Sequence, residues 1–305
     1  MAHREFFVRI AADLSAIDLP APAKINLFLA VTGRRDDGFH ELLSVAAPLA
    51  WGDTIAVDVG DRSFSVTCDT EGIPTDGTNL VIRAANAFAD SAGWPGGARF
   101  AISKRIPAGA GLGGASSDAT SALVALNGLA GAPLGGEALA RVASKVGSDC
   151  ALFLAGGPAV MRGRGERVEA LAPAASGRIR GRRVLVFKPG FAIATPWAYA
   201  ALAASPSDYV PAHEAEARLG SWIAGVEPAE ALLFNSMEGP AFAKFAALPE
   251  LLGALRARFG ISPRMSGSGS ACFALLPEDA DAGPLVAAIR EAWGSSALVV
   301  DTRFA

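Results

Sequence analysis

Cysteine, histidine and tyrosine are scarce in this chain of 305 residues, which contains three, three and two of them. The cysteines, Cys68, Cys150 and Cys272, lie far apart, so their spacing supports neither a disulfide framework nor a metal site. A reducing compartment is the simplest interpretation of this cysteine usage. We also expect no metal ion to be held by a cage of protein ligands alone.

An excess of positive charge is absent as well, because 27 Lys and Arg residues face 30 Asp and Glu residues and give a net charge of -3. Proteins that bind nucleic acid are usually basic, which argues against nucleic acid as the main partner. No apolar run approaches the roughly 18 residues that a membrane-spanning helix needs, and Arg9, Asp13 and Asp18 interrupt the N-terminal segment. We therefore expect a cytoplasmic monomer or homodimer with a small-molecule substrate and no membrane partner.

Strands and helices are mixed along the chain without strict alternation, which is typical of the α+β class. Branched and aromatic residues predict strands, and apolar residues at helical spacing predict helices. The predicted strands are 24–31, 53–60, 63–69, 98–106, 184–190 and 297–304. The predicted helices are 78–93, 116–131, 136–147, 196–204, 212–224, 228–256 and 278–294, and 151–171 is predicted to be a hairpin that turns at Gly156–Gly157.

A change of composition at residues 172–183, which are small and basic with little apolar periodicity, predicts a domain boundary. We therefore expect an N-terminal extension at 1–19, to which we assign no function, and two domains at 20–176 and 177–305.

The segment KRIPAGAGLGGASSDAT, residues 104–120, is the most informative stretch. Four glycines fall within six positions, namely Gly109, Gly111, Gly113 and Gly114, and two serines follow. Glycines let a ligand approach the backbone, and N–H groups that lead into a helix N-terminus bind anions. A glycine-rich turn without a ligand is the alternative, but this many glycines and serines exceed what a turn requires. The sequence therefore predicts a phosphate loop.

Three kinds of phosphate loop can be compared with this segment. A Walker A loop is excluded because no lysine follows the last glycine. Gly109, Gly111 and Gly114 match the dinucleotide fingerprint G-x-G-x-x-G, but no acidic residue follows about 20 positions later to hold a ribose. A kinase loop that wraps a nucleoside triphosphate remains, with serine hydroxyls that reach phosphate oxygens or Mg²⁺. Lys104 either meets the phosphate charge or is a solvated strand lysine.

Further polar residues could carry chemistry. Lys24 and Asn26 share one face of a predicted strand, which is either an exposed face or a buried polar site. Asp149 precedes an apolar run, where it is either a helix cap or a base that accepts a hydroxyl proton in phosphoryl transfer. His40, beside Phe39 in a polar turn, is either a recognition residue or a surface histidine. The turn MSGSGSACFALL is either a tight turn or a second wall of a triphosphate site.

Three blocks that occur in this order, PAKINLFL, KRIPAGAGLGGASS and MSGSGSACFAL, resemble the galactokinase, homoserine kinase, mevalonate kinase and phosphomevalonate kinase (GHMP) superfamily. The added blocks GRRDDGFHEL, TNLVIRAA and GSDCALFL resemble the family within it that phosphorylates 4-diphosphocytidyl-2-C-methyl-D-erythritol. The similarity runs from about residue 20 to the C-terminus. A sister kinase of the superfamily, and a nucleotide-binding protein without phosphoryl transfer, stay open as alternatives.

The resemblance implies an N-terminal domain like one of the small ribosomal subunit and a ferredoxin-like C-terminal α/β sandwich. It also implies ATP-dependent phosphorylation of the 2-hydroxyl of the cytidine diphosphate-linked substrate, in the non-mevalonate pathway of isoprenoid biosynthesis. ATP and Mg²⁺ are then the cofactors, and phosphoryl transfer is direct and in line. In this interpretation Asp149 is the base and Lys24 assists it.

The resemblance also assigns the remaining site residues. The ATP phosphate loop comprises Pro107, Ala108, Gly109, Ala110, Gly111, Leu112, Gly113, Gly114, Ala115, Ser116 and Ser117. Asn79 and Leu80 match the adenine side, Lys104 lies near the nucleotide, and Ser116 is a candidate Mg²⁺ contact. Asn26, Phe39, His40 and Tyr199 match substrate contacts. Asp118 departs from the asparagine that the family often has, and we expect it in the first turn of the helix, facing away from the phosphates.

Overall fold

The computed structural model describes residues 16–305, which pack into two compact units. Of the described residues, the first unit comprises 16–23, 52–108 and 113–156, and the second comprises 24–51, 109–112 and 157–305. Two long strands, β1 (Ala16–Arg34) and β2 (His40–Asp61), contribute residues to both units. The predicted extension lies mostly outside the described residues, and its last four residues, 16–19, belong to β1.

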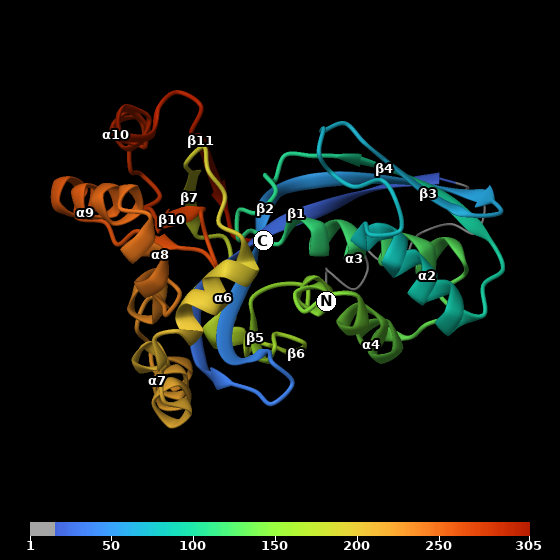
Figure 1. The fold of residues 1–305 in the computed structure, drawn as a ribbon, viewed down its shortest axis with the longest axis horizontal. Helices are drawn as coiled ribbons and strands as arrows, with labels where there is room; N and C mark the ends of the chain where they lie inside the picture. The colour runs from blue at the N-terminus through green and yellow to red at the C-terminus, as the bar shows by residue number, and fades with distance from the viewer. Residues whose placement is uncertain (1–15) are drawn as a thin grey trace. The chain divides into compact units, whose positions relative to one another are not determined.

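In the first unit, three helices accompany two short strands, of which β4 pairs with β2 and β3 pairs with β4. Its own elements are β3 (Phe64–Cys68), α2 (Leu80–Ala92), β4 (Gly97–Ser103), α3 (Gly114–Leu129), α4 (Gly136–Val146) and the 3₁₀ helix η1 (Cys150–Leu154). β4 pairs antiparallel with β2 and parallel with β3. Figure 1 shows α2 and α3 side by side on one face of these strands.

The apolar faces of these elements form one core. Phe88 of α2, Phe100 of β4 and Leu123 and Leu126 of α3 are fully or almost fully buried in it. The apolar spacing of the sequence correctly predicted all three helices. α2 and α4 each bury one face in this core, whereas α3 is buried on most of its sides.

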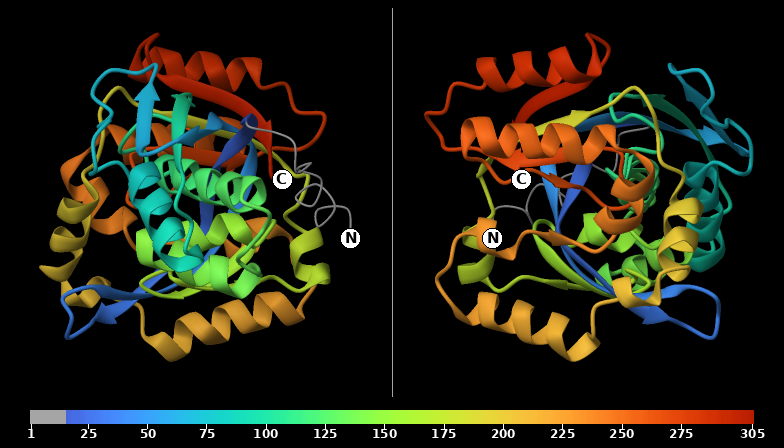
Figure 2. Two further views of the ribbon diagram at one scale, coloured as in Figure 1. Left: turned by 90° about the vertical axis from the view of Figure 1, so that its right-hand side faces the viewer. Right: turned by 60° about the vertical axis from the view of Figure 1, so that its left-hand side comes forward.

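The second unit has its own antiparallel sheet in the strand order β11-β7-β10-β9. Its elements beyond β1 and β2 are β5 (Ala159–Gly163), β6 (Arg167–Ala170), α5 (Pro173–Gly177), β7 (Arg183–Lys188), α6 (Thr195–Ala203), η2 (Pro206–Asp208), α7 (Ala212–Ala224), η3 (Ala229–Leu232), β8 (Phe234–Asn235), α8 (Glu238–Lys244), α9 (Ala247–Phe259), β9 (Arg264–Met265), β10 (Cys272–Leu275), α10 (Gly283–Trp293) and β11 (Leu298–Arg303). β5 pairs with β2, and β8 pairs with β1. Figure 2 shows α9 and α10 beside one another over this sheet.

The α+β class is confirmed by this mixture of helices and two sheets. The hairpin at 151–171 was placed wrongly, because 150–154 form η1 and the chain turns between β5 and β6, where Gly165 has a φ of 103°. The long helix predicted at 228–256 is also wrong. It is divided into η3, β8, α8 and α9, because Phe234–Asn235 pairs with β1 instead of continuing a helix. The linear domains 20–176 and 177–305 stay a prediction.

Candidate active site

The glycine loop has a backbone that only glycine adopts easily. Gly109, Gly111 and Gly113 have φ values of 62°, 77° and 74°, in the left-handed region that side chains disfavour. Helix α3 begins directly afterwards at Gly114, and no side chain caps its N-terminus. The hydroxyl of Ser117 in its first turn is buried without a hydrogen-bond partner. This loop therefore presents the N–H groups and the polar atom that an anion site needs.

Gly111 also meets another part of the backbone within the second unit. A Cβ at this position would lie 2.3 Å from the carbonyl oxygen of Ser266. The Ser266 hydroxyl donates to the Gly111 carbonyl at 3.2 Å, and the Ala271 N–H donates to the Ala110 carbonyl at 3.0 Å. The SGSGS turn is thus a backbone partner of the loop, which explains one of its glycines without a ligand.

Lys24 and Asn26 are buried in β1, so the exposed-face alternative is wrong. The Lys24 ammonium donates to Asn26 Oδ1 at 2.6 Å, and the Asn26 amide donates to the Ser44 hydroxyl at 2.8 Å. Ser44 in turn donates to the Phe28 carbonyl at 2.6 Å. A Cβ on Gly267 would lie 3.5 Å from Lys24 Nζ. The SGSGS turn therefore lies directly beside this lysine.

Asn235 holds the SGSGS turn, residues 266–270, in place, and the sequence did not predict this role. Its amide donates to the carbonyls of Met265 and Gly267 at 2.8 and 2.9 Å, and its Oδ1 accepts from the Met237 N–H. Asn235 lies within the predicted helix 228–256, so nothing in the neighbouring sequence indicates that it binds this turn.

His40 and both tyrosines of the chain form one aromatic group in the second unit. The His40 ring lies 4.9 Å from Tyr199 and 5.9 Å from Tyr209, measured between ring centroids. His40 Nε2 is 3.1 Å from the Tyr209 hydroxyl. Burial, with a smaller contribution from Arg34, lowers the pKa of His40. A neutral imidazole beside two phenol rings suits the recognition of a flat polar ring. Tyr209 was missed because nothing in its local sequence indicates the contact.

Phe39, the neighbour of His40, is 52% exposed, and the Arg164 guanidinium lies 4.6 Å above its ring. Because Arg164 covers one face of the ring, only the other exposed parts of Phe39 are open to a ligand.

Asp149 stands directly before η1 in the first unit, and its side chain makes no capping hydrogen bond. The helix-cap alternative is therefore wrong. Nearby, a Cβ on Gly147 would lie 3.6 Å from Ser116 Oγ and 3.8 Å from Leu80 Cδ1. The structure thus gathers Leu80 and Ser116 close to the segment that carries Asp149. Its cooperation with Lys24, which belongs to the second unit, stays a prediction.

Asn79 caps α2, since its Oδ1 accepts from the Val81 N–H at 2.9 Å. Its amide donates to the Pro74 carbonyl at 2.6 Å. The helix accordingly begins at Leu80, and an adenine contact of Asn79 stays a prediction.

Lys104 is enclosed by two carboxylates, so the solvated-lysine alternative is wrong. Its ammonium lies 2.5 Å from Asp53 and 2.9 Å from Asp118, and its side chain is 8% exposed. Burial alone would lower the pKa of Lys104, but Asp118 and Asp53 outweigh this effect and raise it. Asp53 was missed because its partners are about fifty residues away along the chain.

The predicted orientation of Asp118 away from the phosphates stays a prediction. Asp118 is the fifth residue of α3, and its side chain is buried against Lys104. Burial raises the pKa of its carboxyl to about 7, although Lys104 opposes this shift. One of its oxygens, Oδ1, has no hydrogen-bond partner.

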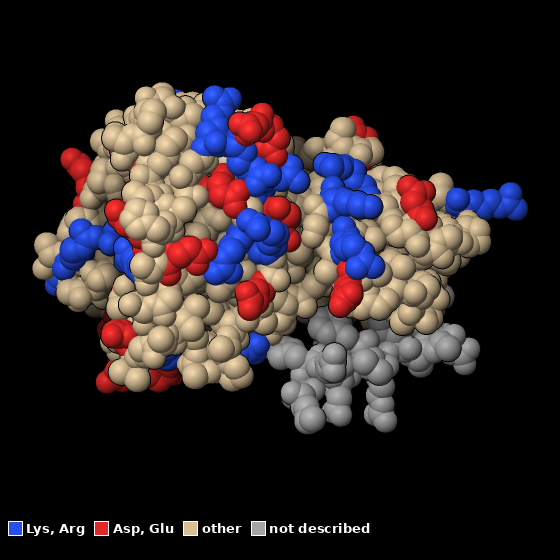
Figure 3. All heavy atoms as spheres, turned by 90° about the horizontal axis from the view of Figure 1, so that it is seen from below, with Lys and Arg blue, Asp and Glu red and all other residues tan. Residues whose placement is uncertain are grey.

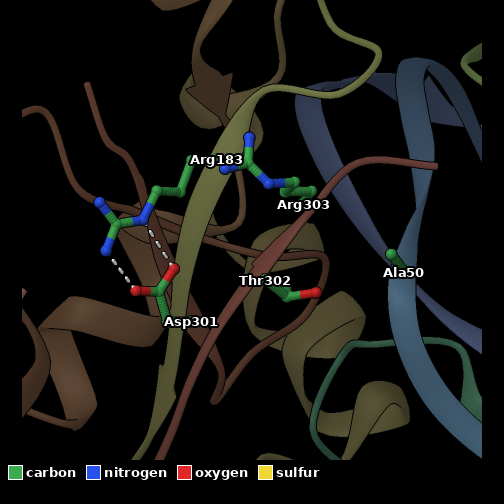
Figure 4. Close-up of a pocket in the computed structure, with 5 residues that line it drawn as sticks. All are labelled: Ala50, Arg183, Asp301, Thr302 and Arg303. Carbon is green, nitrogen blue, oxygen red and sulfur yellow. Dashed lines mark hydrogen bonds and ion pairs between the residues drawn. The ribbon is translucent and has the colours of Figure 1, made fainter. Parts of the chain in front are cut away.

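A pocket of about 220 Å³ in the second unit is lined by Ala50, Arg183, Asp301, Thr302 and Arg303, and by none of the predicted site residues (Figure 4). Both guanidinium groups are neutralised, because Arg183 pairs with Asp301, as the dashed lines show, and Arg303 pairs with Glu278. This pocket therefore offers no free cation to an anionic ligand.

Within residues 16–305, no three or more His, Cys, Asp and Glu residues gather as a candidate metal site. None of the helices in this range has the length and hydrophobicity to cross a membrane. On the face shown in Figure 3, Lys and Arg side chains are interspersed with Asp and Glu.

Comparison with known proteins extends these observations. Residues 79–157 match the GHMP kinases N terminal domain, and residues 223–295 match the GHMP kinases C terminal domain. A 4-diphosphocytidyl-2-C-methyl-D-erythritol kinase of Thermus thermophilus is 42% identical over 76% of this chain and 78% of its own length. One of Prochlorococcus marinus is 43% identical over 62% of this chain and 59% of its own length.

Solved structures agree with this relationship. A crystal structure of 4-(cytidine 5'-diphospho)-2C-methyl-D-erythritol kinase has 38% identity and a TM-score of 0.71, and covers 94% of this chain and 99% of that one. Homoserine kinase from Cytophaga hutchinsonii, at 18% identity, has a TM-score of 0.74 over 96% of each chain, which shows a shared fold. The chain therefore belongs to the GHMP kinases and, within them, to the family of the 4-diphosphocytidyl-2-C-methyl-D-erythritol kinases.

Proposed function

We propose that this chain transfers the γ-phosphoryl group of ATP to the 2-hydroxyl of 4-diphosphocytidyl-2-C-methyl-D-erythritol, in the non-mevalonate route to isoprenoids. The observation that carries the proposal is the identity of 42% with a kinase of that name over most of both chains. The aromatic group of His40, Tyr199 and Tyr209 supports a cytidine substrate. We place the reaction in the cytoplasm.

In this proposal the glycine loop holds the triphosphate through its N–H groups and the N-terminus of α3. The unpartnered hydroxyl of buried Ser117 fits a phosphate oxygen, and Ser116, half-buried beside it, fits a contact to Mg²⁺. Bound Mg²⁺ would offset the charge that develops on the transferred group.

Asp149 would accept the proton of the attacking hydroxyl, and Lys24 would keep Asp149 ionised and steady the incoming oxygen. The bond from Lys24 to Asn26, and from Asn26 to Ser44, fixes the ammonium in one position. Transfer would proceed directly, in line, without a phosphoenzyme.

The test is ADP release in a coupled assay with ATP, Mg²⁺ and the cytidylyl substrate, on wild type and on Asp149→Asn. We expect turnover in wild type and a loss of 100-fold or more in kcat in the variant, within the range of general-base catalysis (~10²–10⁴-fold). Asp90→Asn, on the surface of α2, is the matched control and should retain full activity.

Near wild-type turnover in Asp149→Asn would remove this residue from the mechanism. Turnover of homoserine, mevalonate or galactose in place of the cytidylyl substrate would make the chain a sister kinase. ATP binding without any turnover would contradict the enzymatic proposal.

A further inference from the structure

The two ends of the glycine loop are joined in the first unit by the buried cluster of Asp53, Lys104 and Asp118. Lys104 precedes the loop and Asp118 follows it in α3, and their side chains are 2.9 Å apart. Asp53, in β2, is the third member, and its side chain is completely buried. The cluster therefore closes a segment whose ends are fourteen residues apart along the chain.

Asp53 holds the entrance of the loop directly. One oxygen accepts the N–H groups of Arg105 and Ile106, at 2.5 and 2.7 Å, and the other accepts from Lys104 Nζ. Charge-assisted hydrogen bonds from two successive N–H groups therefore tie the backbone before Pro107 to this carboxylate.

The Lys104 ammonium also lies against the exit of the loop. A Cβ on Gly114, the first residue of α3, would lie 3.2 Å from Lys104 Nζ. The ammonium therefore sits beside the N-terminus of this helix, where Asp53 and Asp118 balance its charge.

A buried ion cluster of this kind is weak evidence for stability, because desolvation of the charges offsets most of their attraction. Asp118 Oδ1 remains without a partner, which adds to that cost. The presence of this cluster is therefore better explained by a role in positioning the glycine loop than by a contribution to stability.

We propose that Asp53 is a positioning residue for ATP, which acts through Lys104 to fasten both ends of the glycine loop. Through its ion pairs with Asp53 and Asp118, Lys104 helps to hold the loop in place. This inference depends on the use of ATP in the proposed function, but not on the identity of the acceptor alcohol.

The test is calorimetric measurement of the Kd for MgATP, together with the KM of each substrate, in Asp53→Asn. We expect the Kd and the KM for ATP to rise tenfold or more, while the KM of the acceptor and kcat at saturating ATP change less than threefold. Asp58→Asn is the matched control, because Asp58 lies on the same strand in an exposed ion pair with Arg99. It should bind ATP as wild type does.

A double-mutant cycle distinguishes a positioning role of Asp53 from a general loss of structure. If Asp53 acts through Lys104, the variant Asp53→Asn/Lys104→Gln should bind ATP no more weakly than the worse single variant. Additive losses would contradict the inference, as would a folded Asp53→Asn with wild-type affinity, or an equal rise in both KM values.

Removal of one partner from a buried ion pair can cost about 3–5 kcal/mol, so circular dichroism must first show that Asp53→Asn is folded. If it is not, Lys104→Arg takes its place. Arginine keeps the charge but is larger than lysine, and the side chain of Lys104 is almost fully buried. We therefore expect weaker ATP binding, and unchanged binding would overturn the inference. Wild type that binds ATP without turnover would contradict the proposed function and leave this test intact.

Discussion

At the scale of single residues, Asp118 makes the stability of the protein depend on pH. Burial raises the pKa of this carboxyl to about 7 in the folded chain, whereas an unfolded Asp titrates near 3.9. The folded state therefore holds the proton more tightly. The stabilisation from this proton is complete below about pH 4 and is lost as the pH rises through about 7.

Asp118→Asn should remove this dependence, because asparagine cannot titrate and can still accept from Lys104. Urea unfolding at pH 5 and pH 8 measures the effect. Relative to wild type, the variant should gain about 2 kcal/mol in free energy of unfolding between the two pH values. The groups that face this carboxyl are Lys104 and Asp53, and neither changes in the variant. Parallel pH curves for the two proteins would contradict the assignment.

Site residues could be predicted where their neighbours along the chain indicate their role. They could not be predicted where they contact residues that are distant along the chain. Lys24 and Asn26 alternate on one strand, and this local pattern correctly raised the possibility of a buried polar site. Asp53 and Tyr209 instead meet residues 51 and 169 positions away. No local pattern encodes such contacts, which arise only from the packing of the folded chain.

At the scale of elements, the glycine loop offers a matched pair of positions. Gly109 and Gly111 both have positive φ, so alanine at either position costs about 1–2 kcal/mol of backbone strain. At Gly111 the new Cβ would also lie 2.3 Å from the Ser266 carbonyl oxygen, whereas at Gly109 it would meet only the Ala192 Cβ at 3.1 Å.

We therefore expect Gly111→Ala to lower the free energy of unfolding by at least about 2 kcal/mol more than Gly109→Ala, as overpacking against backbone does. Chemical denaturation of both variants measures this difference. Equal losses would show that the turn at Ser266 moves away easily and does not support the loop.

Helices of the first unit were predictable because each is rich in apolar residues and ends near a glycine, as α2 does at Gly93. The region 228–256 was not, because Phe234–Asn235 pairs with β1 and the Asn235 amide binds the turn after β9. Helical propensity in that region is overridden by contacts with distant segments.

At the scale of the whole molecule, the segment 177–305 tests the predicted linear domains. It contains the complete sheet β11-β7-β10-β9. It lacks the β1 partner of β8, the Ala110 carbonyl that Ala271 binds, and the Pro48 carbonyl that Ala305 binds.

We expect this segment, expressed alone, to give a poorly dispersed ¹H–¹⁵N NMR spectrum, since these backbone groups lose their partners. The full chain under the same conditions is the control. A well-dispersed spectrum of the segment would support the linear boundary instead.

The passage of β1 and β2 through both units has a consequence for the history of the gene. The first unit is encoded by three separate stretches, and the second unit occupies the intervals between and after them. Neither unit is therefore encoded by one continuous stretch of the gene. Any recombination that exchanged one unit between related genes would have to exchange all three stretches together, so the two units are expected to be inherited as one.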